Sequence, residues 1–209
     1  MSNIVEVESD ADRASVERFF AANIPDPSRR PLVPRDRDPH SPYRSHILAI
    51  QEDNEIVAAL HAAPPVYEVA DLIPQGLPPE SGTAALEDFV MLYSIAVSES
   101  RRREGLGREL LDRLEQQIAE DKPRVIYGVC ASDSAKFYQR SGYDVRPPES
   151  MLVLKWGSRN SGFPITGDAQ WFTKSVERAP LQTPLPNGKK GLWREFSQWV
   201  HMRLKHGFR

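Results

Sequence analysis

The stretch SESRRREGLGREL, residues 98–110, places three consecutive arginines before Gly105 and Gly107. It follows EDFVMLYSIAV (87–97), a continuous apolar run typical of a strand buried on both faces. After it, apolar residues recur on one helical face, at Leu106, Leu110, Leu111, Leu114 and Ile118. With RVIYGVC (124–130) as a second buried strand, the pattern predicts strand, helix and strand in a parallel crossover.

The turn between the first strand and the helix is a candidate anion site. A helix N-terminus carries unpaired N–H groups and a partial positive charge, and glycines at 105 and 107 allow a phosphate to approach the backbone. Four arginines add positive charge around it, namely Arg101, Arg102, Arg103 and Arg108. The alternative interpretation is a solvated turn that binds nothing.

The N-terminal third predicts a strand, a helix and a hairpin. NIVEVE (3–8) alternates like a strand, and SDADRASVERFFAA (9–22) has the capping residues and apolar spacing of a helix. HILAIQEDNEIVAALHA (46–62) predicts a β-hairpin that turns near Asp53 and Asn54.

Two proline-rich segments, residues 24–45 and 64–85, predict long irregular loops. Such loops either shape and cover a site or form variable surface connections. Beyond the second buried strand, ASDSAKFYQRSGY (131–143) predicts a short helix ending at Gly142, and MLVLKW (151–156) predicts a further strand.

Two motifs resemble signatures of the GNAT superfamily of acyl-CoA-dependent N-acetyltransferases. Arg102-x-x-Gly105-x-Gly107 is similar to the family's (Gln/Arg)-x-x-Gly-x-(Gly/Ala) motif, and FYQRSGY (137–143) is similar to its Phe-Tyr-x-x-x-Gly-(Phe/Tyr) signature. The order of elements also follows the family. The resemblance implies an α/β (α+β) fold over residues 1–156, with a mixed central sheet and a parallel β-α-β cofactor-binding core flanked by helices.

The resemblance also implies how acetyl-CoA, the acyl donor, would be held. The pyrophosphate would lie against the turn after the first buried strand, at Arg102, Arg103, Gly105, Leu106, Gly107 and Arg108. The main chain of Ile95, Ala96 and Val97 would pair with the pantetheine arm like an added strand. Tyr138 would be the general acid that protonates the leaving thiolate; its alternative role is packing on the buried face of its helix.

This chain departs from the family pattern at two places. Where many members have an asparagine that contacts pantetheine, the chain reads CASDSAKFY, so Ser134, or Ser132 or Asp133, would substitute or would cap the helix. Many members carry a catalytic glutamate within the long strand, but this strand has no internal carboxylate. Glu87 and Asp88 stand just before it and are the candidate general bases; the alternative is that both are solvated.

The chemistry of amine acetylation bounds the mechanism. An alkylammonium has a pKa of about 10, and it must lose a proton before its nitrogen can attack a thioester. Direct transfer without a covalent intermediate and without a metal is expected. Cys130 ends a buried strand near this region, and we expect it to be a structural thiol rather than an acyl carrier.

Composition limits the partners. The net charge is −2, with 27 basic and 29 acidic residues, which disfavours a nucleic-acid partner. One cysteine allows no internal disulfide, no apolar run reaches the roughly 20 residues that span a bilayer, and the N-terminus lacks a signal-peptide pattern. A soluble cytoplasmic protein without membrane insertion is expected, and a homodimer is possible.

Residues 157–209 are expected to be a C-terminal extension, an extended strap leading to a basic amphipathic helix. Residues 187–209 contain six basic residues and one acid, with an apolar stripe at Trp193, Phe196, Val200 and Leu204. We expect this helix to dock on its own domain; the alternative is a membrane surface or a partner.

Three functions are consistent with the sequence. The leading one is acetylation of a primary amine of a small molecule or peptide. The second is acetylation of protein lysines or N-termini, and the third is an inactive acyl-CoA-binding module. The acidic balance of residues 1–186, with 28 acids against 21 bases, favours a cationic substrate.

Overall fold

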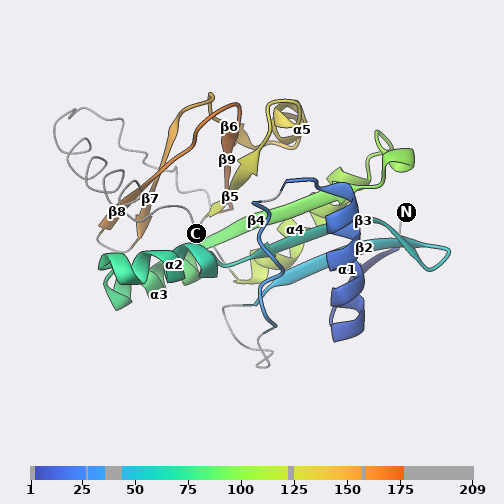
Figure 1. Cartoon of the computed structure of the whole chain (residues 1–209), viewed down its shortest axis with the longest axis horizontal. Helices are drawn as coiled ribbons and strands as arrows, with labels where there is room; N and C mark the ends of the chain where they lie inside the picture. The colour runs from blue at the N-terminus through green and yellow to red at the C-terminus, as the bar shows by residue number, and fades with distance from the viewer. Residues whose placement is uncertain (1–2, 27, 36–43, 122–124, 157–158, 177–209) are drawn as a thin grey trace.

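A seven-stranded mixed sheet runs through the protein in the order β1-β2-β3-β4-β5-β9-β6 (Figure 1). The computed structural model describes residues 3–26, 28–35, 44–121, 125–156 and 159–176. The sheet strands are β1 (Ile4–Glu6), β2 (His46–Glu52), β3 (Glu55–Ala63), β4 (Phe89–Val97), β5 (Val125–Cys130), β6 (Asp144–Val145) and β9 (Gln170–Ser175). The mixed central sheet is therefore confirmed.

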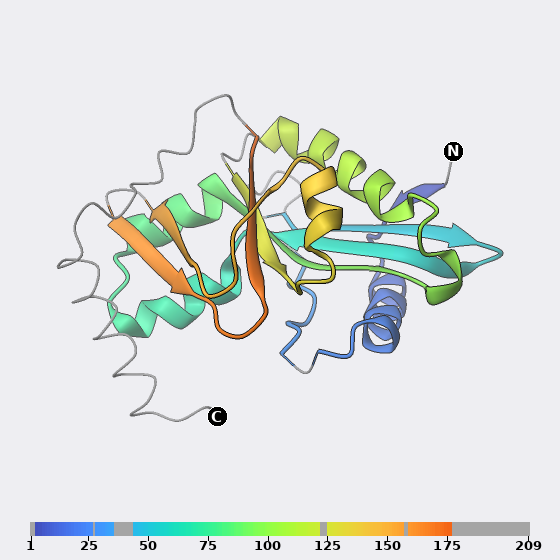
Figure 2. The same cartoon turned by 90° about the horizontal axis from the view of Figure 1, so that it is seen from above.

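Helices cover both faces of the sheet (Figure 2). The helical elements are α1 (Asp10–Asn23), α2 (Val66–Leu72), η1 (Ile73–Gln75), α3 (Pro79–Asp88), η2 (Glu99–Arg101), α4 (Leu106–Asp121) and α5 (Ala135–Arg140). α4 packs on one face through the predicted apolar stripe, which is buried from Leu106 to Ile118. α1 packs on the opposite face through Val16 and Phe20.

The predicted parallel crossover is present but its two strands separate. β4 and β5 pair in parallel from Phe89 opposite Val125 to Leu92 opposite Gly128, and every other pair in this sheet is antiparallel. β4 continues to Val97 beside β3 alone. The splayed ends of β4 and β5 therefore leave a gap in the sheet.

The β2–β3 hairpin is confirmed with its predicted turn. Asp53 and Asn54 have φ of 47° and 65°, the left-handed region that short-side-chain residues tolerate in tight hairpin turns. The ladder shifts register once within this hairpin, between Ile50 and Gln51.

The prediction of an irregular loop over 64–85 is wrong, because α2, η1 and α3 occupy most of it. Its prolines do not interrupt helices. Pro65 and Pro78 are N-cap residues, and Pro79 is the first residue of α3, where a missing N–H costs no helical hydrogen bond. In the other proline-rich segment, residues 24–26 and 28–35 lack helix and strand as expected.

The sheet extends beyond Trp156, so the expected domain boundary is too early. β7 (Met151–Trp156) pairs with β8 (Arg159–Pro164) in a separate two-stranded sheet. β9 then returns to the main sheet between β5 and β6, and the segment expected as an extended strap begins with two strands. The amphipathic helix expected near the C-terminus lies outside the described residues.

In the described part of the chain, no helix is both long and apolar enough to cross a membrane.

Candidate active site

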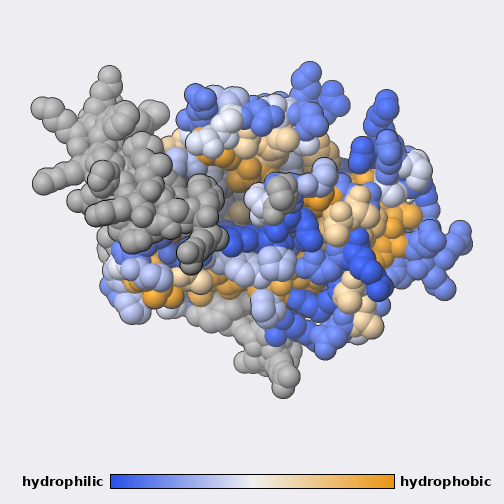
Figure 3. Space-filling model, viewed as in Figure 1, coloured by the Kyte–Doolittle hydropathy of each residue, from blue (hydrophilic) through white to orange (hydrophobic). Residues whose placement is uncertain are grey.

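A cavity of about 1040 Å³ opens where β4 and β5 separate. Its walls are the end of β4 from Met91 to Val97, the end of β5, Tyr138 of α5, the segment after α1, and Glu68 of α2. On the face drawn in Figure 3, hydrophilic side chains cross the middle of the molecule beside hydrophobic ones. This volume is at the upper end of those typical of ligand sites in proteins.

The edge of β4 presents free backbone groups to this cavity. The Ser98 amide donates to the Val57 carbonyl of β3 at 2.8 Å. Because successive amides in a strand point to opposite edges, the Ile95 and Val97 amides point away from β3 and toward the gap. Ala96 is buried, and its side chain belongs to the cluster under α1. An extended chain lying in the gap could therefore pair with Ile95 and Val97.

The turn before α4 has the backbone geometry of an anion site. Arg103 and Gly105 have φ of 69° and 90°, in the left-handed region. Among the described residues, no backbone carbonyl accepts a hydrogen bond from the amides of residues 103–107. These donors lie at the N-terminus of a 16-residue helix, whose dipole favours an anion.

The two glycines of the turn have different roles. A Cβ on Gly105 would meet no atom within 4 Å, so its positive φ is what demands glycine. A Cβ on Gly107 would lie 3.3 Å from Cζ of Phe137 and 3.7 Å from Cγ2 of Val97. Gly107 therefore allows α4 to pack closely on α5, and its role in admitting a phosphate stays a prediction.

The arginines of the turn are partly engaged by the protein. Arg101 pairs with Glu52 and, at 2.8 Å, with Glu104. Arg108 pairs with Asp112 at 2.8 Å and donates to the Arg140 carbonyl at 2.9 Å.

The other two arginines of the turn are less engaged by the protein than Arg101 and Arg108. Arg102 lines the cavity, where its Nε donates to the Val97 carbonyl at 3.4 Å, a long bond that a ligand could replace. Arg103 is exposed beside the turn.

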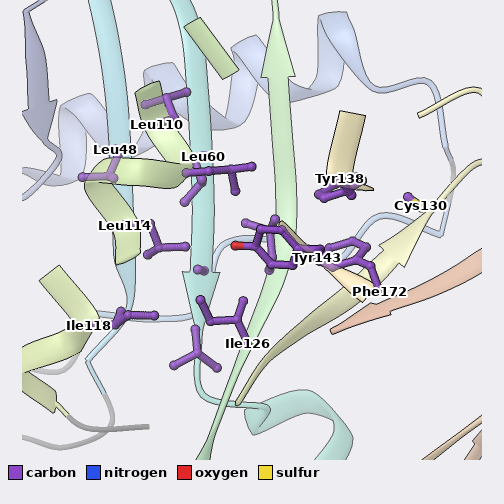
Figure 4. Packing of buried hydrophobic residues seen from close by; sticks show 14 of the residues in the cluster. Leu48, Leu60, Leu110, Leu114, Ile118, Ile126, Cys130, Tyr138, Tyr143 and Phe172 are labelled. Carbon is purple, nitrogen blue, oxygen red and sulfur yellow. The ribbon is translucent and has the colours of Figure 1, made fainter. Parts of the chain in front are cut away.

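Tyr138 packs in the core and also lines the cavity. Its ring is buried and stacks on Phe172 with centroids 3.9 Å apart, so it packs in the core (Figure 4). Tyr138 also lines the cavity. Burial, followed by the effect of Cys130, raises the pKa of the phenol above its usual value. The hydroxyl therefore keeps its proton at neutral pH, which is the protonation state that a proton donor requires.

Cys130 lies beside Tyr138 and lines the same cavity (Figure 4). Burial, reinforced by Asp133, raises the pKa of its thiol to about 11. The thiol is therefore protonated at neutral pH and is a poor nucleophile.

The polar residues before α5 do not cap it through their side chains. Ser134 is the N-cap residue, but its hydroxyl donates to Asp133 at 2.9 Å rather than accepting from a helix amide. The Ser132 hydroxyl donates to the Asp168 carbonyl at 2.6 Å. Asp133 and Ser134 line the cavity, whereas Ser132 does not.

Glu87 and Asp88 are the last two residues of α3, and neither lines the cavity. A different carboxylate does. Glu68 of α2 lies in the cavity wall and accepts a 2.7 Å hydrogen bond from the Tyr93 hydroxyl of β4. The structure thus brings Tyr138, the β4 edge and Arg102 to one cavity, and the half-buried carboxylate in its wall is Glu68 rather than Glu87 or Asp88.

The sequence contained little to indicate Glu68. It falls in a segment expected to be irregular, and its partner Tyr93 is the extra residue of a β-bulge, since Leu92 pairs with Ala62 and Ser94 with His61. Bulges re-aim side chains near sites, but nothing local in FVMLYSIAV indicates one.

Solved structures share this fold at low sequence identity. The ribosomal-protein-S18-alanine N-acetyltransferase from Escherichia coli is 15% identical with a TM-score of 0.51, covering 87% of this chain and 98% of that one. A putative GNAT acetyltransferase from Desulfovibrio desulfuricans is 19% identical with a TM-score of 0.52, covering 85% and 100%. An aminoglycoside 6'-N-acetyltransferase complexed with coenzyme A is 15% identical with a TM-score of 0.51, covering 85% and 99%.

No curated protein sequence matches the chain. The family model described as "Acetyltransferase (GNAT) family" matches residues 13–143, from α1 through the Tyr138 helix to Tyr143. This match spans more than half of the chain, and the splayed strands and the glycine turn both fall inside it. The chain belongs to the GNAT acetyltransferase family.

Proposed function

We propose that the protein transfers an acetyl group from acetyl-CoA to a primary amine of a small molecule or peptide, by direct attack of the amine on the thioester. The proposal rests on one observation, that the free edge of β4 and Tyr138 line the same cavity. The α4 turn lies at the end of the same strand, where a pyrophosphate would bind amides 103–107.

Each group in the cavity has one task. The Ile95 and Val97 amides orient the acyl donor along β4, which places a thioester beside the acceptor and lowers the entropic cost of the reaction. The Tyr138 hydroxyl donates a proton to the departing sulfur. A thiol with a pKa of about 8.5 is a tolerable leaving group as the thiolate, and a proton from Tyr138 assists its departure.

A small acceptor is favoured because the segment after α1 forms one wall of the cavity. The segment after α1 is tied to α1 by the Arg29–Glu17 pair at 2.9 Å and to α2 by the Arg30–Asp71 pair at 2.7 Å. Residues 28–30 line the cavity, so a protein surface would have to displace this segment. Acetylation of protein lysines or N-termini is the second candidate, and an inactive acyl-CoA-binding module is the third.

Substituting Gly105 tests the anion site. Gly105→Val is expected to weaken acetyl-CoA binding at least tenfold, about 1.4 kcal/mol, because a β-branched residue does not adopt the φ of 90° that the turn requires. Gly76→Val is the matched control, since Gly76 has φ of 84°, open space around it, and lies outside the cavity wall. Calorimetry showing equal affinity in both variants and the wild type would remove the anion site from this turn.

Direct transfer predicts that the enzyme carries no acetyl group between substrates. After incubation with acetyl-CoA and an acid quench, intact-protein mass spectrometry is expected to show Cys130 unmodified, because its thiol has a pKa of about 11. An acetyl adduct on Cys130 that disappears when an amine is added would establish a two-step route instead.

A further inference from the structure

Glu68 is more buried than the other carboxylates of the cavity wall. Asp26, Asp133 and Asp168 also line it, but all three are exposed, whereas Glu68 is half-buried. Among the described residues, no side chain other than Tyr93 donates a hydrogen bond to the Glu68 carboxylate. A half-buried carboxylate with one side-chain donor retains capacity to accept a further hydrogen bond from a ligand.

Tyr93 fixes where this carboxylate lies. Its ring stacks on buried His61 with centroids 5.2 Å apart and meets the edge of Tyr67 at 5.8 Å, so it has little freedom to turn. As the bulged residue of β4, it brings Glu68 to the strand whose edge would hold the acyl donor. The strand that lacks a carboxylate of its own therefore has one beside it, supplied by α2.

We propose that Glu68 binds the ammonium group of the acceptor and removes its proton before attack on the thioester. This inference rests on the proposed function and extends it to an acceptor whose reacting group is cationic. Glu68 takes one proton from the ammonium, and the nitrogen lone pair forms a bond to the acyl carbon. The carbon–sulfur bond then breaks, the sulfur takes the proton of Tyr138, and the second nitrogen proton passes to the Tyr138 phenolate as the amide forms. Glu68 then releases its proton to solvent, which returns both residues to their starting states.

The charges around Glu68 suit a base. Burial raises the pKa of its carboxyl, and the hydrogen bond from Tyr93 opposes that rise. Arg30 also lowers the pKa and Asp71 raises it, while the phenols of Tyr67 and Tyr127 face the same region. A raised carboxyl pKa narrows the gap to the amine, which makes proton transfer easier.

Kinetics against pH test the proposal. With n-butylamine as the acceptor, Glu68→Gln is expected to lower kcat/KM by about 100-fold or more while leaving acetyl-CoA affinity unchanged. The amide oxygen can still accept from Tyr93, so the fold is retained. Glu80→Gln, at an exposed position of α3 outside the cavity wall, is the matched control and is expected to behave as wild type.

The Tyr93→Phe variant distinguishes a catalytic base at position 68 from a residue that only holds α2 against β4. The base works as a carboxylate, so kcat/KM falls as pH drops below the Glu68 pKa. Removing the Tyr93 hydrogen bond, which favours the charged form, raises that pKa and moves the acid limb of the pH profile to higher pH. If the Tyr93–Glu68 hydrogen bond only held α2 against β4, Tyr93→Phe would lower the melting temperature and leave the acid limb of the pH profile at the same pH.

A binding measurement decides the matter without turnover. In carbon-13 NMR of the coenzyme A complex, the Glu68 carboxyl, assigned by its loss in Glu68→Gln, is expected to show a lower pKa when n-butylammonium is added and no change with n-butanol. An unchanged Glu68 pKa, or full kcat/KM in Glu68→Gln, would overturn the proposal. A wild-type protein that acetylates no amine but shows this pKa change would contradict the proposed function and keep the ammonium site.

Discussion

Replacing Tyr138 with phenylalanine is expected to lower kcat by about 10- to 1000-fold with little change in the dissociation constant of acetyl-CoA. The ring would still stack on Phe172, so the substitution removes the proton donor and keeps the packing. Water can take over part of the proton transfer, which gives the lower end of this range. Steady-state release of free thiol, with the accepted amine in excess, measures the change.

Tyr143→Phe is the matched control for this experiment. Tyr143 packs against Tyr138 with centroids 5.9 Å apart and belongs to the same core, but it does not line the cavity. Its loss of a hydroxyl is expected to leave kcat within about twofold of wild type. Full activity of Tyr138→Phe across about pH 6 to 10 would reassign Tyr138 to packing alone.

Gly128→Ala is expected to destabilise the protein by about 2–4 kcal/mol, equivalent to a loss of roughly 5–15 °C in melting temperature. Gly128 pairs with Leu92 at the last position before β4 and β5 separate. A Cβ there would lie 2.4 Å from Cζ of Phe172 and 2.9 Å from the Leu92 carbonyl oxygen. The backbone oxygen cannot move aside without disturbing the ladder.

The control for that substitution is Gly82→Ala in α3. Its Cβ would meet Val69 and Leu77 side chains at 3.4 and 3.6 Å, close to ordinary contact distances, and alanine has the better helix propensity. Thermal unfolding followed by circular dichroism compares the two variants. Equal melting temperatures would contradict the close approach of β9 to the end of the β4–β5 pair.

The sequence predicted those parts of the fold that depend on local patterns. The apolar run of β4, the leucine stripe of α4 and the Asp53–Asn54 turn each carry their own periodicity or turn chemistry, and all three are present. The prolines of residues 64–85 misled the prediction, because a proline at a helix start and a proline within a loop look alike without the helix in view.

Features that depend on distant segments were not predictable. β9 enters the sheet between β5 and β6 and so pairs with residues far from it in sequence. Glu68 reaches the cavity because α2 lies against the bulge of β4. The local sequence of neither element indicates this contact. The strand, turn and helix around Gly105 were predictable because they are contiguous in the sequence, whereas the candidate base is assembled by tertiary packing.

Measuring acetyl transfer to an amine tests the proposed function directly. Purified protein, acetyl-CoA and a panel of primary amines would be incubated together, with free thiol followed by absorbance and acetylated products identified by mass spectrometry. We expect amine-dependent thiol release that matches the amount of acetylamine formed. Binding of acetyl-CoA without transfer to any amine, small or protein-borne, would contradict the catalytic function and leave an acyl-CoA-binding module.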